Sequence, residues 1–314
     1  MTDSTESKTA SKHKIVVCRD LGKEAMSLLH NSGHVIVAWE KDTPPPREWV
    51  LENVQAARGI CVMMADKVDE ELLAAVADIA VLLVLMTMRR IGEALQVVQE
   101  GRWPQTPWSP FLLTGPALTR PSLTIGFLGF GRISHCTLER LLAFTQPRNS
   151  AHAPRCIYTS SRSRSNQQDI DNQYTQQFGV ATRRVEADVL AKESDVLIIL
   201  CSLNEDTKGM VNAAFLEKMK SDAALINVAR GPIVDSAALA AALEKGHLCG
   251  AGLDVIDGEP NIPRDHPLVM NPRCVVLPHV GSASDMSRNG MANLCVTNVL
   301  AGVAGEEMPS ELRS

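Results

Sequence analysis

The stretch that decides the fold is residues 124 to 134, TIGFLGFGRIS, in which an apolar segment leads into a glycine turn and a helix start. Gly129 and Gly131 match the first two glycines of the dinucleotide-binding pattern G-x-G-x-x-G, and Ser134 replaces the third. Gly129 can make the tight turn, and Gly131 lets the backbone approach a pyrophosphate at the N-terminus of a helix beginning near Arg132. Because the third glycine serves helix–strand packing, we interpret Ser134 as a slightly loosened contact. We predict a nucleotide site, the alternative being a turn without a ligand.

The strand expected to follow this turn ends in residues 158 to 165, YTSSRSRS. In an NAD-binding sheet this strand end carries an acidic residue that receives the 2′-hydroxyl of the adenosine ribose. Here there is no acid, and hydroxyl and guanidinium groups suited to a 2′-phosphate stand in its place. The candidates are Ser160, Ser161, Arg162 and Arg164. We therefore predict NADP(H) in preference to NAD(H), the alternative being that the arginines only solvate a loop.

Short apolar runs alternate with amphipathic stretches along the whole chain, which is typical of βα units and parallel sheets. Strands are expected at residues 14 to 19, 34 to 39 and 59 to 63, then at 125 to 128, 156 to 159, 196 to 200, 224 to 228, 252 to 256 and 274 to 277. Helices are expected near residues 23 to 31 and 47 to 57, in one long region over 68 to 101, and over 283 to 305. The six later strands complete a dinucleotide-binding sheet, so we predict an α/β fold with a doubly wound parallel Rossmann-type sheet.

Composition limits the kind of protein and partner. With 314 residues the chain can form two domains, and 45% hydrophobic and 21% charged residues are typical of a globular protein. A net charge of −5 argues against nucleic acid, and the longest apolar run, residues 76 to 88, is too short to span a membrane. The eight cysteines form no C-x-x-C pair and residues 1 to 12 are too polar for a signal sequence, so we predict a reduced, cytoplasmic protein without a metal site.

Residues 102 to 122, RWPQTPWSPFLLTGPALTRPS, form a segment that we call the arm. Its prolines prevent a regular helix or strand. An apolar but irregular segment of this kind usually crosses a domain or subunit boundary. The alternative is an internal surface loop.

Three later stretches place polar residues just past a predicted strand, where open parallel sheets bind ligands. Arg230 would offer a planar, charged fork to a carboxylate and an adjacent carbonyl. His279 can protonate a carbonyl oxygen as hydride arrives, and Glu259, if within reach, would orient the imidazole and stabilise its protonated form. Asp254 could contact the nicotinamide side of the site. Taken singly, the arginine could cap a strand, the glutamate could belong to a turn and the histidine to the core; we favour a joint site.

On these residues the chain resembles the D-isomer-specific 2-hydroxyacid dehydrogenase family, and within it the glyoxylate/hydroxypyruvate reductases. The resemblance extends over nearly all of residues 14 to 312. The segments that carry it are GFLGFGRIS, CSLNEDTKGMVN (201 to 212), INVARGPIVD (226 to 235), AGLDVIDGEP (251 to 260) and LPHVGSAS (277 to 284). It implies NADPH-dependent reduction of a small 2-oxo acid, glyoxylate or hydroxypyruvate, to the D-2-hydroxy acid.

The resemblance also implies roles and domains. Arg230 would hold the substrate carboxylate and carbonyl, Glu259 and His279 would be the acid/base pair, and the protein would be a homodimer built through the arm and the cofactor domain. The residues expected to bind the cofactor are Gly129, Gly131, Arg132, Ile133, Ser160, Ser161, Arg162, Cys201, Ser202, Asp254 and Gly281. The expected domains are a disordered tail (1–13), a substrate domain (14–77 and 283–314) and a dinucleotide-binding domain (78–282).

One departure from the family pattern falls at Val76, which runs directly into Ala77. At this point the family has a strand, a glycine loop that holds the substrate carboxylate, a helix and a further strand; by usual element lengths, roughly 30 to 40 residues are absent. A mispredicted exon or a shortened isoform would explain the loss. It would leave a smaller, truncated flavodoxin-like α/β substrate domain with three strands and an exposed edge. Two alternatives to an NADPH-dependent reductase therefore stay open: a catalytically weakened nucleotide-sensing or partner-binding module, and an NAD-dependent D-2-hydroxyacid dehydrogenase.

Overall fold

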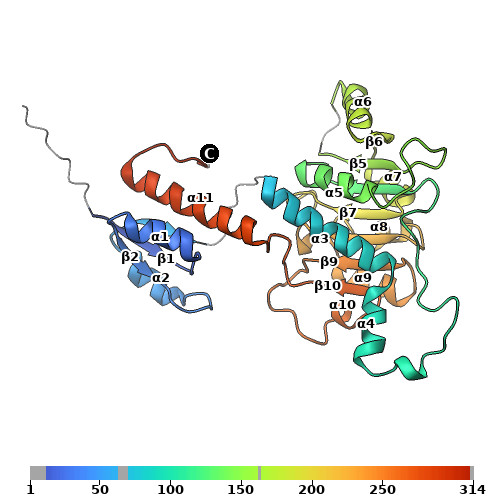
Figure 1. The fold of residues 1–314 in the computed structure, drawn as a ribbon, viewed down its shortest axis with the longest axis horizontal. Coiled ribbons are helices and arrows are strands. Elements are labelled where there is room, and N and C mark those ends of the chain that lie inside the picture. Colours follow the sequence, from blue (N-terminus) through green and yellow to red (C-terminus); the bar gives the residue numbers. More distant parts are fainter. Residues whose placement is uncertain (1–11, 63–69, 162–163, 312–314) are drawn as a thin grey trace, which may run out of the picture. The chain divides into compact units, whose positions relative to one another are not determined.

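The computed structural model describes residues 12–62, 70–161 and 164–311. The chain divides into two compact units, shown in Figure 1. The small unit joins the first 71 residues to the segment from residue 283 onward, and the large unit covers residues 72–282. No helix in the described ranges combines the length and the apolar character needed to cross a bilayer.

The small unit is built on a parallel sheet of three strands, β1 (Lys14–Val17), β2 (Val35–Ala38) and β3 (Ala57–Cys61), in the order β2-β1-β3. Its helices are α1 (Lys23–Asn31), α2 (Arg47–Asn53) and α11 (Asp285–Ala304). Ile15 and Val17 of the central strand form one core with Val296 and Val303, so α11 packs on this sheet. The three strands match the expectation for a shortened domain, and among the described residues β3 pairs only with β1.

The element ends in the small unit differ slightly from those predicted. The strands end one or two residues early, and residue 63, included in the predicted third strand, lies outside the described residues. The helix predicted over residues 47 to 57 is wrong at its end, because α2 stops at Asn53. Ala56 adopts a left-handed φ of 59° and the chain enters β3 at Ala57.

The large unit contains a parallel sheet of seven strands in the order β10-β9-β8-β7-β4-β5-β6. The strands are β4 (Thr124–Leu128), β5 (Arg155–Thr159), β6 (Thr182–Arg184), β7 (Val196–Ile199), β8 (Ala224–Asn227), β9 (Gly250–Leu253) and β10 (Cys274–Val276). The sequence predicted six of them and missed β6, which is only three residues long and carries two arginines. The order reverses between β4 and β7, so the loops after these two strands border the crevice where doubly wound sheets bind ligands.

Helices cover both faces of this sheet, which confirms the doubly wound prediction. The helices are α3 (Glu70–Met88), α4 (Ile91–Gln99), α5 (Arg132–Leu142), α6 (Gln167–Phe178), α7 (Ala187–Glu193), α8 (Ala213–Lys218), α9 (Ser236–Glu244) and α10 (Pro267–Met270). Ile125 and Phe127 of β4 share one core with residues of α3, α5 and α6. The neighbouring Leu128 belongs to a second core with residues of α7, α8 and α9. Because successive side chains of a strand alternate between faces, each central strand is buried on both.

The region from 68 to 101 is not one helix, as predicted, but two. Residues 68 and 69 lie outside the described part, and α3 and α4 are separated at Arg90, whose φ of 51° is left-handed. An ion pair between Arg90 and Glu93 holds the break. Residues 88 to 91 contain no glycine or proline, and Gly92 already belongs to α4. The arm that follows is irregular, as predicted, apart from one short 3₁₀ turn, η1 (Trp103–Gln105).

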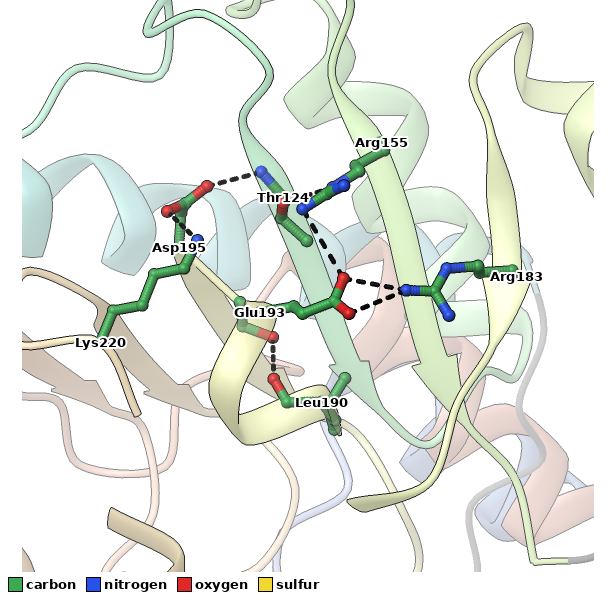
Figure 2. Close-up of polar contacts among 8 residues, drawn as sticks. Thr124, Arg155, Arg183, Leu190, Glu193, Asp195 and Lys220 are labelled. Carbon is green, nitrogen blue, oxygen red and sulfur yellow. Dashed lines mark hydrogen bonds and ion pairs between the residues drawn. The ribbon is translucent and has the colours of Figure 1, made fainter. Parts of the chain in front are cut away.

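A buried carboxylate fixes the amino end of β4. Asp195 accepts a hydrogen bond from the Thr124 backbone N–H at 2.7 Å and pairs with Lys220 Nζ at 2.7 Å, as Figure 2 shows. Nearby, Arg155 Nε donates to Thr124 Oγ1 at 2.7 Å. These contacts lie at the start of the strand whose other end carries the glycine turn. They therefore set where that turn begins.

Candidate active site

The glycine turn lies between β4 and α5 at the reversal of strand order. Gly129 has a φ of 90°, and a Cβ added there would lie 2.7 Å from the backbone N of Cys201, so no side chain fits. A Cβ added to Gly131 would meet no atom within 4 Å, which leaves space in front of the helix. No side chain caps the N-terminus of α5. Its first N–H groups are therefore available to an anion such as a pyrophosphate.

Ser134, the departure from the glycine pattern, has a specific contact. Its side chain is buried, and its Oγ donates a hydrogen bond to the carbonyl oxygen of Gly129 at 2.9 Å. The serine thus joins the first turn of α5 to the loop before it. Our interpretation of a slightly loosened contact is incomplete, because a glycine would lack this bond. The other two turn candidates, Arg132 and Ile133, are exposed and half-buried in the first turn of α5.

The end of β5 lies beside the glycine turn. Thr159 Oγ1 accepts a hydrogen bond from the Gly129 backbone N–H at 3.3 Å. Ser160 and Ser161 follow directly, and the predicted Arg162 lies outside the described residues. Ser160 contacts a residue that we did not predict, because Arg184 Nε donates to its Oγ at 3.2 Å. Thr159 stands in the YTSSRSRS stretch but was not singled out, and Arg184 was missed because it stands in no recognisable motif.

The loop after β7 forms the other border of the crevice. Cys201 is half-buried, and its burial raises the pKa of the thiol to about 11. The thiol is therefore protonated at neutral pH and acts as a small packing group. Ser202 is exposed, and its carbonyl accepts a bond from Thr207 Oγ1 at 2.7 Å.

Asp254, at the end of β9, organises the loop after β10. Its buried carboxylate accepts hydrogen bonds from the backbone N–H groups of Val280 and Gly281, each at 2.8 Å. Its own carbonyl accepts from the backbone N–H of His279 at 2.9 Å. Burial raises the pKa of this carboxyl, although the two N–H donors act in the opposite direction. Asp254 therefore holds the turn from which His279 projects.

His279 and Glu259 are in direct contact. His279 Nδ1 lies 2.8 Å from Glu259 Oε1, and Glu259 Oε2 accepts from the Ile256 backbone N–H at 3.3 Å. The histidine has a φ of 55°, unusual outside glycine, and such backbone is tolerated where the surroundings enforce it. Its side chain is 49% exposed. With Nδ1 directed at the carboxylate, Nε2 is the atom left for a substrate.

Arg230 follows β8 and directly precedes η2 (Gly231–Ile233). It is exposed, and its Nη1 donates to the carbonyl oxygen of Ala229 at 2.7 Å. Among the described residues no carboxylate pairs with it. A Cβ on Gly231 would lie 2.2 Å from the carbonyl carbon of Ile256, so the loop of Arg230 packs against the segment that leads to Glu259. The structure thus brings His279 and Glu259 into contact and puts Arg230 on the adjoining loop, without a bond to either.

An open glycine turn at the reversal point of a doubly wound sheet defines the dinucleotide-binding class of α/β proteins. Within that class, the chain belongs to the D-isomer specific 2-hydroxyacid dehydrogenase family, whose NAD binding domain matches residues 81–281. The chain is therefore an oxidoreductase, and the resemblance noted from its motifs is confirmed.

Two relatives that match over nearly the whole length of the chain are reductases. The chain is 32% identical to the human glyoxylate reductase/hydroxypyruvate reductase, over 96% of this chain and 98% of that protein. It is 31% identical to the glyoxylate reductase of Thermofilum pendens, over 96% of this chain and 94% of that protein. The human alignment extends over 341 positions, more than the 314 residues of this chain. It therefore contains positions at which this chain has no residue.

Solved structures agree with this family. A protein of Thermus thermophilus has a TM-score of 0.78 and 30% identity, with 94% of this chain and 98% of that chain covered. An NADPH-dependent glyoxylate/hydroxypyruvate reductase from Sinorhizobium meliloti, in complex with NADP and malonate, has a TM-score of 0.71 and 26% identity, with 96% of each chain covered. The chain is thus a 2-hydroxyacid dehydrogenase similar to glyoxylate/hydroxypyruvate reductases.

Proposed function

We propose that this chain reduces a small 2-oxo acid, glyoxylate or hydroxypyruvate, to the D-2-hydroxy acid with NADPH. The observation that carries the proposal is the His279–Glu259 contact on a turn held by Asp254, in the same sheet as the open glycine turn. The names of the human and Sinorhizobium meliloti relatives support the substrate class, and the name of the Sinorhizobium meliloti enzyme also supports the cofactor. The absence of an acid after β5 supports NADPH over NADH.

The residues present fit a dinucleotide. The open space at Gly131 and the uncapped N-terminus of α5 would receive its pyrophosphate, and Ser160 and Ser161 its adenosine ribose. When bound, the nicotinamide supplies hydride to the carbonyl carbon of the substrate. Asp254 and Gly281, on the turn beside His279, are the candidates to face that end of the cofactor.

The side chains at the site bind the substrate and supply the proton. Arg230, exposed and without a carboxylate partner among the described residues, binds the substrate carboxylate and its neighbouring carbonyl oxygen. His279 gives the proton on Nε2 to that oxygen as the alkoxide charge develops. Glu259 holds the imidazole through Nδ1 and balances its positive charge. Arg230 thus orients the substrate, while the histidine completes the reduction.

NADPH oxidation with glyoxylate, hydroxypyruvate and pyruvate tests this function directly. We expect turnover with the first two, and NADH in place of NADPH should give a lower kcat/KM. A protein that binds NADPH but oxidises it with none of the three acids would remove the enzymatic proposal. A preference for NADH would instead favour the NAD-dependent dehydrogenase.

A second candidate function is a nucleotide-sensing or partner-binding module with weakened turnover. The three-stranded sheet of the small unit, and the alignment positions at which this chain has no residue, favour it. Inserting the corresponding segment of the human relative after Val76 should then raise the turnover number. If the insertion leaves turnover unchanged in a folded protein, the shortened domain does not limit catalysis.

We also propose that the protein is a cytoplasmic homodimer joined through the arm and the large unit. Trp108 and Phe111 in the arm are 94% and 81% exposed, which is unusual for large apolar side chains of a monomer. Light scattering should give twice the chain mass. Replacing Trp108 and Phe111 together by serine should give the monomer, whereas a wild-type monomer would exclude this interface.

A further inference from the structure

Arg184 occupies a place beside the predicted adenosine site that the proposed function does not use. It is the last residue of β6, and it is paired in register with Tyr158 of the neighbouring β5. Two residues after Tyr158, β5 has ended and the chain reaches Ser160. An arginine at the end of the edge strand therefore lies next to the loop that follows β5.

The contacts of Arg184 direct its guanidinium to that loop. Nε donates to Ser160 Oγ at 3.2 Å, and Nη2 lies 3.5 Å from the Ser160 carbonyl oxygen. The backbone N–H of Arg184 donates to Asp171 Oδ2 at 3.1 Å, and Asp171 is buried and also accepts from the hydroxyl of Tyr158. Both the main chain and the side chain of Arg184 are therefore fixed to β5 and its surroundings.

The charge partner of Arg184 is weakly held. Its Nη1 pairs with Glu186 Oε1 at 2.6 Å, but the Glu186 side chain is 76% exposed, against 13% for Arg184. An exposed carboxylate of this kind contributes little to stability and can turn into water. A phosphate beside Ser160 would replace it with a doubly charged partner that accepts two guanidinium bonds at once.

We propose that Arg184, together with Ser160, binds the 2′-phosphate of NADP(H) and determines the preference for it over NAD(H). The inference rests on the proposed function and assigns a specificity residue to its cofactor site. Glu186 is then the group that the phosphate displaces, and it opposes binding by its own charge. The selectivity for NADP(H) over NAD(H) then comes from a residue of β6 as well as from the loop after β5.

The neighbouring Arg183 provides a matched control. It belongs to the same strand, but its side chain points to the other side and pairs with Glu193 at 3.0 and 2.9 Å, a carboxylate that also lies near Arg155 (Figure 2). Removing Arg183 takes away the same charge from the same strand without touching Ser160. Any effect specific to Arg184 must therefore come from its position.

Calorimetric binding of adenosine 2′,5′-bisphosphate and of adenosine 5′-monophosphate, which differ only by the 2′-phosphate, tests the proposal without catalysis. Arg184→Ala should weaken the bisphosphate by about tenfold or more, as expected for a lost charge-assisted pair, and the monophosphate by less than about twofold. Arg183→Ala should change neither. Glu186→Gln should tighten the bisphosphate alone.

The outcomes separate this inference from the proposed function. If wild-type protein prefers the bisphosphate and Arg184→Ala keeps that preference, Arg184 is not the phosphate ligand although NADP(H) use stands. Equal weakening of both nucleotides would mean that the guanidinium stacks on adenine, which also overturns the proposal. A wild-type protein without preference would refute both. Should Arg184→Ala not fold, Arg184→Lys, which keeps the charge but not the two-pronged geometry, should still weaken the bisphosphate severalfold.

Discussion

A histidine serves as a proton donor only when its free nitrogen is aimed at the reacting oxygen, and two acidic residues fix the ring of His279 and the turn that carries it. Glu259 contacts the ring itself. The Asp254 carbonyl accepts from the backbone N–H of His279, and the Asp254 carboxylate accepts from the next two backbone N–H groups. The first contact fixes the tautomer, and the second fixes a backbone conformation that an isolated chain would disfavour. Losing either set of contacts should impair the proposed proton transfer, the first by releasing the ring and the second by releasing the turn.

His279→Gln tests the donor itself. Glutamine keeps a polar side chain at the turn but cannot deliver a proton from Nε2, so kcat should fall by about 10²- to 10⁴-fold. The Kd for NADPH, measured by fluorescence, should change little because the nucleotide turn is untouched. An unchanged kcat would show that the proton comes from elsewhere.

Asp254→Asn should alter how stability depends on pH. Burial raises the pKa of Asp254 in the folded protein above its ordinary value of 3.8. In the pH window between the ordinary and the raised pKa, the folded protein holds a proton that the unfolded chain has released. In that window the contribution of this group to the free energy of unfolding falls as pH rises, and it is constant above the raised pKa. The wild-type free energy of unfolding minus that of the variant should therefore grow as pH is lowered through the window. Urea titrations between pH 4 and pH 7 measure this, and a constant difference would contradict it.

The glycine turn makes a paired prediction for an element. Gly131→Ala should fold normally, since its φ of −100° suits alanine and the added Cβ meets no atom, yet it should weaken NADPH binding by filling space needed for phosphate. Gly129→Ala should instead destabilise the fold, because φ is 90° and the Cβ would overlap the Cys201 backbone. Thermal unfolding and NADPH titration of both variants separate the two effects. Normal stability of Gly129→Ala would refute the geometry described for this turn.

Ser134→Ala tests the hydrogen bond between Ser134 and the Gly129 carbonyl, which joins α5 to the glycine turn. Alanine fits the space of serine but cannot donate to the Gly129 carbonyl, so the free energy of unfolding should decrease by about 0.5 to 1.5 kcal/mol. Urea denaturation measures the loss. Thr137→Ala in the next turn of α5 is a useful comparison, since its hydroxyl bonds only within the helix. An unchanged free energy of unfolding in Ser134→Ala would mean that the bond to Gly129 adds nothing.

The elements show what the sequence could and could not predict. The strands of the large unit were predictable because buried parallel strands are continuous apolar runs, and the glycine turn because its spacing is required by phosphate geometry. The strand β6 was missed because two arginines in three residues leave no apolar pattern typical of a strand, and Arg184 was missed with it. The break at Arg90 had no signal, because an ion pair and packing by the arm near Met88 stabilise it. Ser134 was recognised as a substitution, but its bond depends on the distance across the turn.

At the scale of the molecule, the candidate site was predictable as a set of residues because parallel strands bring their carboxyl ends to one edge. The contact between His279 and Glu259 could be predicted because both residues follow strands that end at this edge. The role of each residue and the cofactor preference stay predictions until turnover is measured. The three strands and the last helix of the small unit were predictable because each keeps its own apolar pattern, whereas the shortening was inferred from the resemblance to the family.

The small unit carries a consequence for handling the protein. The strand β3 presents a row of backbone N–H and C=O groups that no other described strand meets, and Ile60 and Val62 on and beside it are exposed. Unprotected borders of this kind recruit extended segments from other molecules and seed insoluble material during storage or heating. Ile60→Lys should slow the growth of turbidity at 40 °C while leaving the melting temperature within a few degrees, since a lysine there repels incoming chains. Unaltered turbidity would show that aggregation starts at another part of the protein.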